Sequence, residues 1–596
     1  MLNSRHGHIR FRRAAAWRFA AASVPTAFLI FLLAIPLYWI GRVSFGYPEV
    51  SLDAYEQLVN SSAHLRVLGQ TLTMAGIATV AALLLGYPVA YVIAQLRHPW
   101  RQIALCVVLL PLWTSLLVRT YAWLIILAPN GPVSRLLMWF ESDSSPIDLV
   151  YQRTGVLIGL THSVLPYLIL PIYAAILKLD PKLAQAASTL GAAPTRTFFQ
   201  VTLPLTLPGV IAGVLFAFLL GLGAFVIPAL LGGPSDRTIA IMIESAANQS
   251  LNWNYAAALA LELLAVTLFI LYCQHRLFGL GAMFGAGPSL ESVGFRLRPF
   301  ARVWNAVANT LPSVPAGWLL RRRVSESNRG RAPVLDVVLR VIAGIGFVYL
   351  ALPLFVVVPV SFSSSQYLQF PPPGLSLQWY VRFLSDERWI DATALSVVVG
   401  LAVVVLALIV GTLAAVAVAK GTSRWRSILA VACIAPMVIP NMVLALGVFF
   451  TFSQLHLVGT VSGIVLAHSM LALPFVFIAV TAALQEIDPS LERAADVLGA
   501  RPFHAFRRVV LPLLKPFLIT AALFAFIISF DEIVIALFLT SVSARTLPKM
   551  IWENITMFID PTVSAVSVIL ILLSSVFVLG GQLLQARRAR IAKEQA

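Results

Sequence analysis

Two stretches of this chain repeat each other. Residues 179–204 read LDPKLAQAASTLGAAPTRTFFQVTLP, and residues 487–512 read IDPSLERAADVLGARPFHAFRRVVLP; thirteen of the 26 positions are identical. Each copy begins with an Asp-Pro pair, which is typical of a capped helix start. Gly191 and Gly499 follow a short apolar helical face, where a helix end favours a residue at positive φ. We expect a short helix, a sharp turn and a second short helix in each copy.

The rest of the chain is strongly apolar. Of 596 residues, 59% are hydrophobic and 11% are charged, and the mean hydropathy is +0.88. In a soluble chain about a quarter of all residues are charged, because they form its surface. We therefore predict an all-α integral membrane protein and exclude a secreted or cytosolic one. The net charge of +17 would suggest nucleic acid in a soluble protein. Here the basic residues gather in short loops between apolar runs, so we expect a lipid bilayer and no nucleic acid as partner.

Runs of about 20 apolar residues, each long enough to cross a bilayer, form two groups of six. The first group is placed at about 17–40, 71–95, 103–127, 154–178, 206–230 and 254–276, and the second at about 337–360, 391–418, 427–452, 459–484, 514–540 and 557–583. The basic loops fall on the cytoplasmic side when both termini are cytoplasmic. The sequence therefore predicts about twelve spans, with the repeats on the cytoplasmic face between the fourth and fifth span of each half.

We divide the chain into a first half at 1–278, a basic cytoplasmic linker at 279–335 and a second half at 336–596. The linker is either a solvated tether or a site for anionic lipid headgroups. The arginine-rich start, Arg5 to Arg13, is similar to a signal peptide, although the many later spans favour an uncleaved first helix.

The simpler interpretation of the repeat is a segment that only packs on its own helix bundle. Its recurrence at the same topological place favours a docking surface for another protein.

The repeat resembles the Glu-Ala-Ala loop of the permease subunits of binding-protein-dependent ABC importers. In the first copy the matching residues are Ala186, Ala187, Gly191, Leu203 and Pro204, and in the second they are Ala494, Ala495, Gly499, Leu511 and Pro512. The leading glutamate of the family is Gln185 in one copy and Arg493 in the other, with Glu492 one residue early. This resemblance covers nearly the whole chain apart from the linker.

What the resemblance implies is a type I importer with two pseudo-twofold-related halves of six helices, fused in one chain in a bacterial inner membrane. The two repeats would couple to a dimer of cytoplasmic ATP-binding subunits, and a periplasmic protein would deliver the substrate. ATP and magnesium would belong to the ATPase partner, with no cofactor bound by this chain.

Three shorter strings resemble spermidine/putrescine permeases: WTSLLVRTYAW at 113–123, FVIPALLGGP at 225–234 and SFDEIVI at 529–535. A polyamine is therefore the leading substrate. Branches of the family for ferric iron, opine-like compounds and aminoethylphosphonate share much of these strings, so those substrates stay open.

Charged residues inside the spans are costly and usually face a pathway or a partner. The substrate-pathway candidates are Asp531, Glu532, Arg119, Trp113 and Tyr121. Structural ion pairing is the alternative for the three charges, and an interfacial aromatic belt is the alternative for Trp113, Tyr121 and Trp123. We expect His162 and His468 to be buried and hydrogen-bonded.

The sequence contains no Gly-Lys dipeptide and therefore no Walker-type phosphate loop, and it has no His/Cys spacing of a metal site. An enzyme is disfavoured, and ATP hydrolysis is expected on a separate subunit. A secondary transporter of two six-helix halves remains the alternative from another class. Such a carrier does not need a matched docking segment in each half.

Overall fold

The computed structural model describes residues 22–140, 148–278, 334–367, 369–420, 424–541, 544–557, 561–573 and 575. Nearly all of the predicted linker and the arginine-rich start lie outside these residues. The described part is helical, with one isolated β-bridge between Ser363 and Leu375. It holds ten helices long and apolar enough to cross a membrane, and a bent pair that makes an eleventh. The predicted all-α membrane fold is confirmed.

The first half runs from Ala22 to Phe278. Its helices are Ala22–Ser44, which contains α2 (Ile35–Ser44), then α3 (Asp53–Asn60), α4 (Ser62–Gln95), α5 (His98–Trp113), α6 (Leu116–Leu127), α7 (Pro132–Phe140), α8 (Arg153–Leu177), α9 (Pro181–Thr189), α10 (Pro194–Thr197), α11 (Leu203–Leu222), α12 (Val226–Leu231), α13 (Ile239–Glu244) and α14 (Trp253–Phe278).

The second half repeats this order without a counterpart of α7. Its helices are α18 (Val334–Ser361), α19 (Gln378–Ser385), α20 (Glu387–Lys420), α21 (Arg424–Val438), α22 (Asn441–Gln454), α23 (Val461–Glu486), α24 (Pro489–Val497), α25 (Pro502–Ala505), α26 (Leu511–Asp531), α27 (Val534–Leu539), α28 (Leu547–Met557) and an apolar helix at Thr562–Leu573. Of the twelfth predicted span, 557–583, the structure describes residues 557, 561–573 and 575.

The third and fifth spans of both halves are broken, which corrects the continuous spans predicted at 103–127, 206–230, 427–452 and 514–540. Between α21 and α22 the chain bends by 106° at Pro440, which has φ −55° and ψ 133°. Proline has no N–H to continue the helix, and it drives the residue before it out of the helical region. Thr114 and Ser115 are extended at the equivalent place between α5 and α6.

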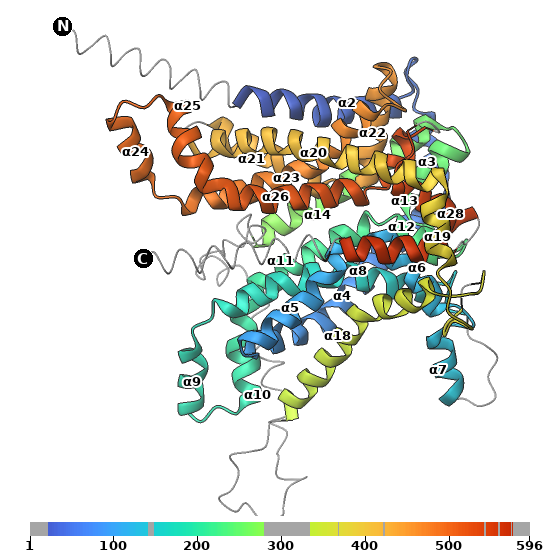
Figure 1. Ribbon diagram of the computed structural model, residues 1–596, viewed down its shortest axis with the longest axis horizontal. Coiled ribbons are helices and arrows are strands. Elements are labelled where there is room, and N and C mark those ends of the chain that lie inside the picture. Colours follow the sequence, from blue (N-terminus) through green and yellow to red (C-terminus); the bar gives the residue numbers. More distant parts are fainter. Residues whose placement is uncertain are drawn as a thin grey trace, which may run out of the picture.

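The first helix of each half packs against the opposite half. In Figure 1, α2 lies along the second-half helices and contacts α22, while α18 lies along α4 and α5 of the first half. Glycines allow these crossings: a Cβ on Gly447 would stand 2.8 Å from Ile40, and a Cβ on Gly346 would stand 2.6 Å from Val89. Small residues at such points let two backbones approach closely. The two halves are therefore interlocked.

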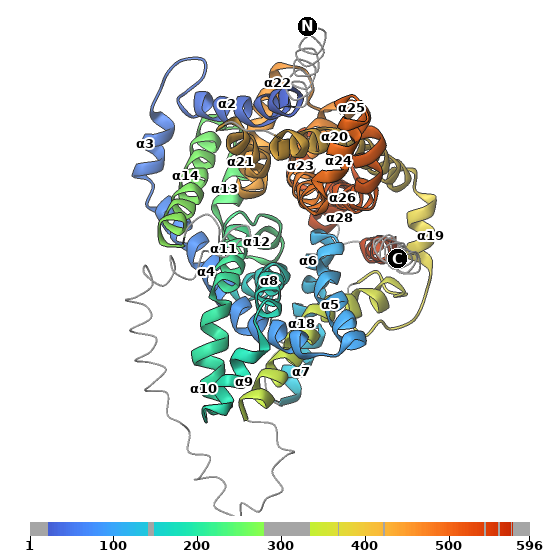
Figure 2. The same ribbon diagram turned by 90° about the vertical axis from the view of Figure 1, so that its left-hand side faces the viewer.

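The two repeats lie at one end of the molecule, on two separate projections that we call legs. Figure 1 shows α9 and α10 below and α24 and α25 above, at the left, while α3, α19 and α28 lie at the right. We call the left end the repeat end and the opposite one the far end. Viewed from the repeat end, α3 and α19 occupy opposite flanks (Figure 2).

Candidate functional site

The first repeat forms the expected capped helix and turn. The Asp180 carboxylate accepts the Lys182 N–H at 2.9 Å, and Pro181 begins α9. Gly191 has φ +82°, and the Ala192 N–H donates to the Ala187 carbonyl at 3.0 Å. That bond across a residue at positive φ is a Schellman cap.

The second repeat has the same geometry. The Asp488 carboxylate accepts the Ser490 N–H at 2.8 Å, and hydrogen bonds from the Ser490 side chain and backbone hold its pKa below the ordinary value. Gly499 also has φ +82°, and the Ala500 N–H donates to the Ala495 carbonyl at 2.9 Å. The prediction that both glycines take positive φ is confirmed.

Both repeats expose apolar residues to the outside. Leu190 and Leu498 are each 88% exposed, and α9 has no buried residue. In each copy one alanine, Ala187 or Ala495, is partly buried, whereas Ala186 and Ala494 are exposed. A group of exposed apolar residues on a surface turn is typical of a docking surface.

The second short helix of each repeat joins the fifth span without a break. In the first half, α10 passes through a π-helical turn at Phe198–Thr202 into α11, which begins at Leu203 with Pro204 in its first turn. In the second half, α25 passes through Phe506–Val510 into α26, which begins at Leu511 with Pro512 in its first turn. Each exposed turn is thus followed by one unbroken helical segment that runs into a membrane-spanning helix.

Asp531 joins the two halves inside the membrane. It is the last residue of α26, and its two carboxylate oxygens each accept the Leu116 N–H at 3.1 Å. The Ser115 side chain also hydrogen-bonds this carboxylate. Leu116 is the first residue of α6, so Asp531 satisfies a free N–H at the positive end of a helix in the other half.

Glu532 turns away from this contact. Its carboxylate accepts the Ile535 N–H at 2.9 Å and caps the start of the short helix α27, and the side chain is 8% exposed. The two neighbouring acids therefore cap two different helices. Sequence reasoning missed these capping roles because the helix breaks that need them are not visible in an apolar run.

Arg119 lies three residues into α6 and is 8% exposed. Its charge interacts with Asp531 and with Tyr167 of α8, but its Nε and Nη1 atoms are buried and have no hydrogen-bond partner among the described residues. One turn along α6, the Trp123 Nε1 atom is likewise buried and unpaired. Both donors lie on α6, one turn apart.

An aromatic group surrounds this region. Trp123, His162 and Tyr349 have ring centroids 5.3 to 5.5 Å apart, and His162 Nε2 lies 3.3 Å from the Leu350 carbonyl. His468 is also buried, with Nδ1 3.1 Å from the Ser529 hydroxyl. Both histidines are buried and hydrogen-bonded, as expected.

The two aromatic pathway candidates occupy different positions. Tyr121 on α6 is fully buried and accepts a hydrogen bond from Ser564 at 3.4 Å. Trp113 ends α5 and is partly buried. The structure brings Arg119 and Asp531 together, whereas Glu532 and Tyr121 make separate contacts.

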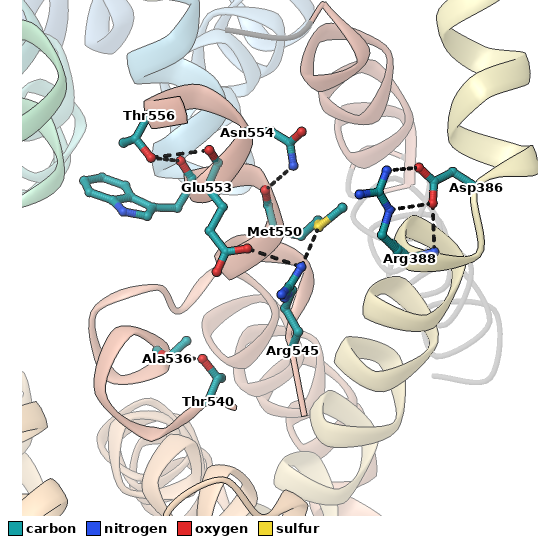
Figure 3. A network of polar contacts seen from close by, with 10 residues as sticks. Asp386, Arg388, Ala536, Thr540, Arg545, Met550, Glu553, Asn554 and Thr556 are labelled. Atoms are coloured by element: carbon teal, nitrogen blue, oxygen red, sulfur yellow. Dashed lines mark hydrogen bonds and ion pairs between the residues drawn. The ribbon is translucent and has the colours of Figure 1, made fainter. Parts of the chain in front are cut away.

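A second polar group, not foreseen from the sequence, lies on α28 at the far end. Arg545 Nη1 lies 3.4 Å from Glu553 Oε2 (Figure 3). Burial lowers the pKa of Lys549, and the charges of Glu553 and of Glu244 from the first half partly offset that effect. The only early sign of this group is the Arg-Thr pair that precedes both α28 and α13.

We call each contact between the fifth span of one half and the third span of the other half a crossing. Asp531 lies at one crossing, and the second crossing has the same kind of helix breaks but no charged residue among those described. There the fifth span of the first half breaks at Gly223, which lies against the Pro440 break of the second half. A Cβ on Gly223 would stand 3.2 Å from the Pro440 Cβ. The pseudo-twofold symmetry of the breaks is thus kept, but only one of the two crossings is polar.

Comparison with known families gives two matches to one family. The family described as "Binding-protein-dependent transport system inner membrane component" matches residues 82–279 and again residues 407–590. Each match contains one of the repeats and the broken helices that follow it.

Curated relatives each align with about two fifths of the chain. Spermidine/putrescine transport system permease protein PotB of Haemophilus influenzae is 35% identical over 42% of this chain and 91% of its own length. PotB of Escherichia coli is 36% identical over 37% of this chain and 81% of its own length. Putrescine transport system permease protein PotI of Escherichia coli is 32% identical over 39% and 84%.

Among solved structures, a bacterial ABC transporter involved in the import of the acidic polysaccharide alginate aligns with 45% of this chain and 99% of its own. The identity is 21% and the TM-score is 0.40. At that score the similarity supports no further conclusion.

Proposed function

Because the chain belongs to the family of binding-protein-dependent transport system inner membrane components, with one match in each half, we propose that it moves a polyamine from the periplasm to the cytoplasm. As a member of this family it is a multi-pass inner membrane permease of an ABC importer, with both permease subunits in one chain. The names of the relatives PotB and PotI support a polyamine as the substrate.

The observation that carries the transport mechanism is the matched pair of exposed turns at the repeat end. In our proposal Leu190 and Leu498, each 88% exposed, sit in a dimer of cytoplasmic ATP-binding subunits. ATP and magnesium belong to that partner, and this chain binds no cofactor. When the ATP-binding subunits move α9 and α24, the movement reaches α11 and α26 through the unbroken π-helical turns.

This assignment orients the molecule. The repeat end faces the cytoplasm together with both termini, and the far end faces the periplasm and a substrate-binding protein. Asp531 and Arg119 then lie toward the periplasmic side of the pathway. Closure of the ATPase dimer moves the two legs and alternately opens each side.

The unpaired donors of Arg119 support a second substrate class. Two buried guanidinium nitrogens that no described residue hydrogen-bonds suit an anionic group such as the phosphonate of aminoethylphosphonate better than an ammonium. For a polyamine, the same arginine serves to hold Asp531 in place and leaves cation recognition to other carboxylates.

The first test measures ATP hydrolysis by the chain reconstituted in lipid nanodiscs with its ATPase and binding protein. The panel contains spermidine, putrescine, ferric iron and aminoethylphosphonate. Stimulation by a polyamine supports the proposal. Stimulation by aminoethylphosphonate alone keeps the importer and replaces the substrate.

A second test addresses the ATPase contact. Leu190→Arg combined with Leu498→Arg is expected to weaken association with the ATPase by about tenfold or more, because one charge enters the apolar centre of each contact. Val50→Arg is the matched control, since Val50 is 76% exposed at the far end. Equal ATPase binding by both variants argues against docking at the repeats.

A further inference from the structure

The short helices α3 and α19 at the far end are held in the same way in the two halves. Each follows the first spanning helix of its half. The Ser44 hydroxyl lies 2.8 Å from the Tyr55 hydroxyl, and the Ser361 hydroxyl lies 2.7 Å from the Tyr380 hydroxyl. Each helix is therefore fastened by its own tyrosine to the last residue of α2 or α18.

The loops leading into the two helices also match. The Ser51 N–H donates to the Phe45 carbonyl at 2.8 Å, and the Ser376 N–H donates to the Phe362 carbonyl at 2.7 Å. The ring centroids of Phe45 and Tyr55 are 5.1 Å apart, and those of Phe362 and Tyr380 are 5.2 Å apart. Such agreement between halves of different loop length indicates that the position of the helices matters.

The helix α19 has three distinct faces. At about 100° per residue, positions three and four apart share a face. One face packs on the bundle through Trp379 and Phe383, which are 5% and 7% exposed. A second face is apolar yet exposed, and a third is polar. The apolar flank comprises Leu377, Val381 and Leu384, which are 60%, 62% and 66% exposed, and the polar flank comprises Gln378, Arg382 and Ser385.

The helix α3 repeats this division. Ala54 is buried against the bundle, whereas Leu52 and Val59 are 62% and 73% exposed. The polar flank comprises Asp53, Gln57 and Asn60. Glu56 stands where α19 has Val381, so the apolar flank of α3 is the narrower of the two.

The apolar flank of α19 continues into a membrane-spanning surface. Asp386 and Arg388 form an ion pair of 2.7 Å that fixes the corner between α19 and α20 (Figure 3). Beyond this corner an exposed apolar stripe runs down α20, made of Ile390, Val397, Leu401 and Val405. A stripe of this kind on a spanning helix faces lipid.

We propose that α3 and α19 are interfacial helices that bind the lipid of the membrane leaflet at the far end, one on each flank of the molecule. A helix that packs on protein with one face, exposes an apolar flank and presents a polar flank to water fits the headgroup–acyl boundary. Both helices lie at the far end (Figure 1) and on opposite flanks of the bundle (Figure 2). Through the Ser44–Tyr55 and Ser361–Tyr380 contacts they hold the interlocked helices α2 and α18 at a fixed depth.

The test compares neighbouring positions on the two flanks. In a full chain with Cys106, Cys273 and Cys433 replaced by alanine, a fluorophore is attached at Leu384→Cys or Ser385→Cys in nanodiscs. A nitroxide on the upper acyl chain is expected to quench the probe at 384 about threefold more than that at 385, and aqueous iodide is expected to show the reverse order. Val59→Cys and Asn60→Cys give the same comparison on α3.

Two results would overturn the proposal. Equal quenching by iodide at 384 and 385 would place both flanks in water. A probe at 384 that iodide reaches until the periplasmic binding protein is added would assign the flank to that protein. If one labelled variant does not fold, the pair on the other helix still decides the question.

Discussion

The two crossings between a fifth span and a third span are alike in backbone and different in chemistry. At one, Asp531 accepts the N–H of Leu116 with both oxygens at 3.1 Å beside the buried Arg119. At the other, Gly223 rests on Pro440, and the position of Arg119 is taken by Leu444. The helix breaks therefore belong to the shared fold, whereas the charges belong to one crossing. Under the proposed function, a substrate that passes between the halves would meet polar groups on one side.

The largest effect is expected when the polar crossing loses its acid. Asp531→Ala leaves the N–H of Leu116 unpaired and the charge of Arg119 buried without a counterion. Removing one partner of a buried charge interaction typically costs about 3–5 kcal/mol. We expect a loss of that order in the free energy of unfolding, measured by titrating bilayer-like micelles with a denaturing detergent.

The control for this variant is Asn441→Ala at the apolar crossing. Asn441 is exposed and carries no charge, so a change below about 1 kcal/mol is expected. A cost for Asp531→Ala that is no greater than that of Asn441→Ala would show that the carboxylate is not engaged in the membrane.

The next effect in size is a rescue. Arg119→Leu copies Leu444 of the apolar crossing, so combining it with Asp531→Ala removes the unpaired charge. We expect the double variant to recover about 2–3 kcal/mol of the loss, because replacing two buried, interacting opposite charges by apolar side chains is often close to neutral. The same unfolding titration of both single variants and the double variant completes the cycle. Strictly additive losses would mean that the two residues do not interact.

The sequence predicts the local features of the repeats well. The Asp-Pro start and the glycine after an apolar face are short-range signals, and the structure has both caps and both glycines at φ +82°. The two sets of spans also follow from composition, since hydrophobic length is a local property.

The membrane core is less accessible to such reasoning. Hydropathy cannot reveal the break after Trp113, because the residues on both sides are equally apolar, and without the break there is no free N–H for Asp531 to cap. The capping partner lies in the other half, more than 400 residues away (|i−j| = 415). The exchange of α2 and α18 between the halves depends likewise on packing at Gly447 and Gly346, which no periodicity encodes.

The smallest effect concerns the apolar crossing. A Cβ added at Gly223 would stand 3.2 Å from the Pro440 Cβ, so Gly223→Ala requires the two breaks to separate by a few tenths of an ångström. We expect a cost of about 0.5–1.5 kcal/mol in the same titration. Gly76→Ala on α4 is the control, because its Cβ would meet only Phe218, at 3.9 Å, and a gain in helix propensity of up to about 1 kcal/mol is expected there. If both alanines stabilise the protein, the apolar crossing is loosely packed, and the difference between the two crossings is one of packing density as well as charge.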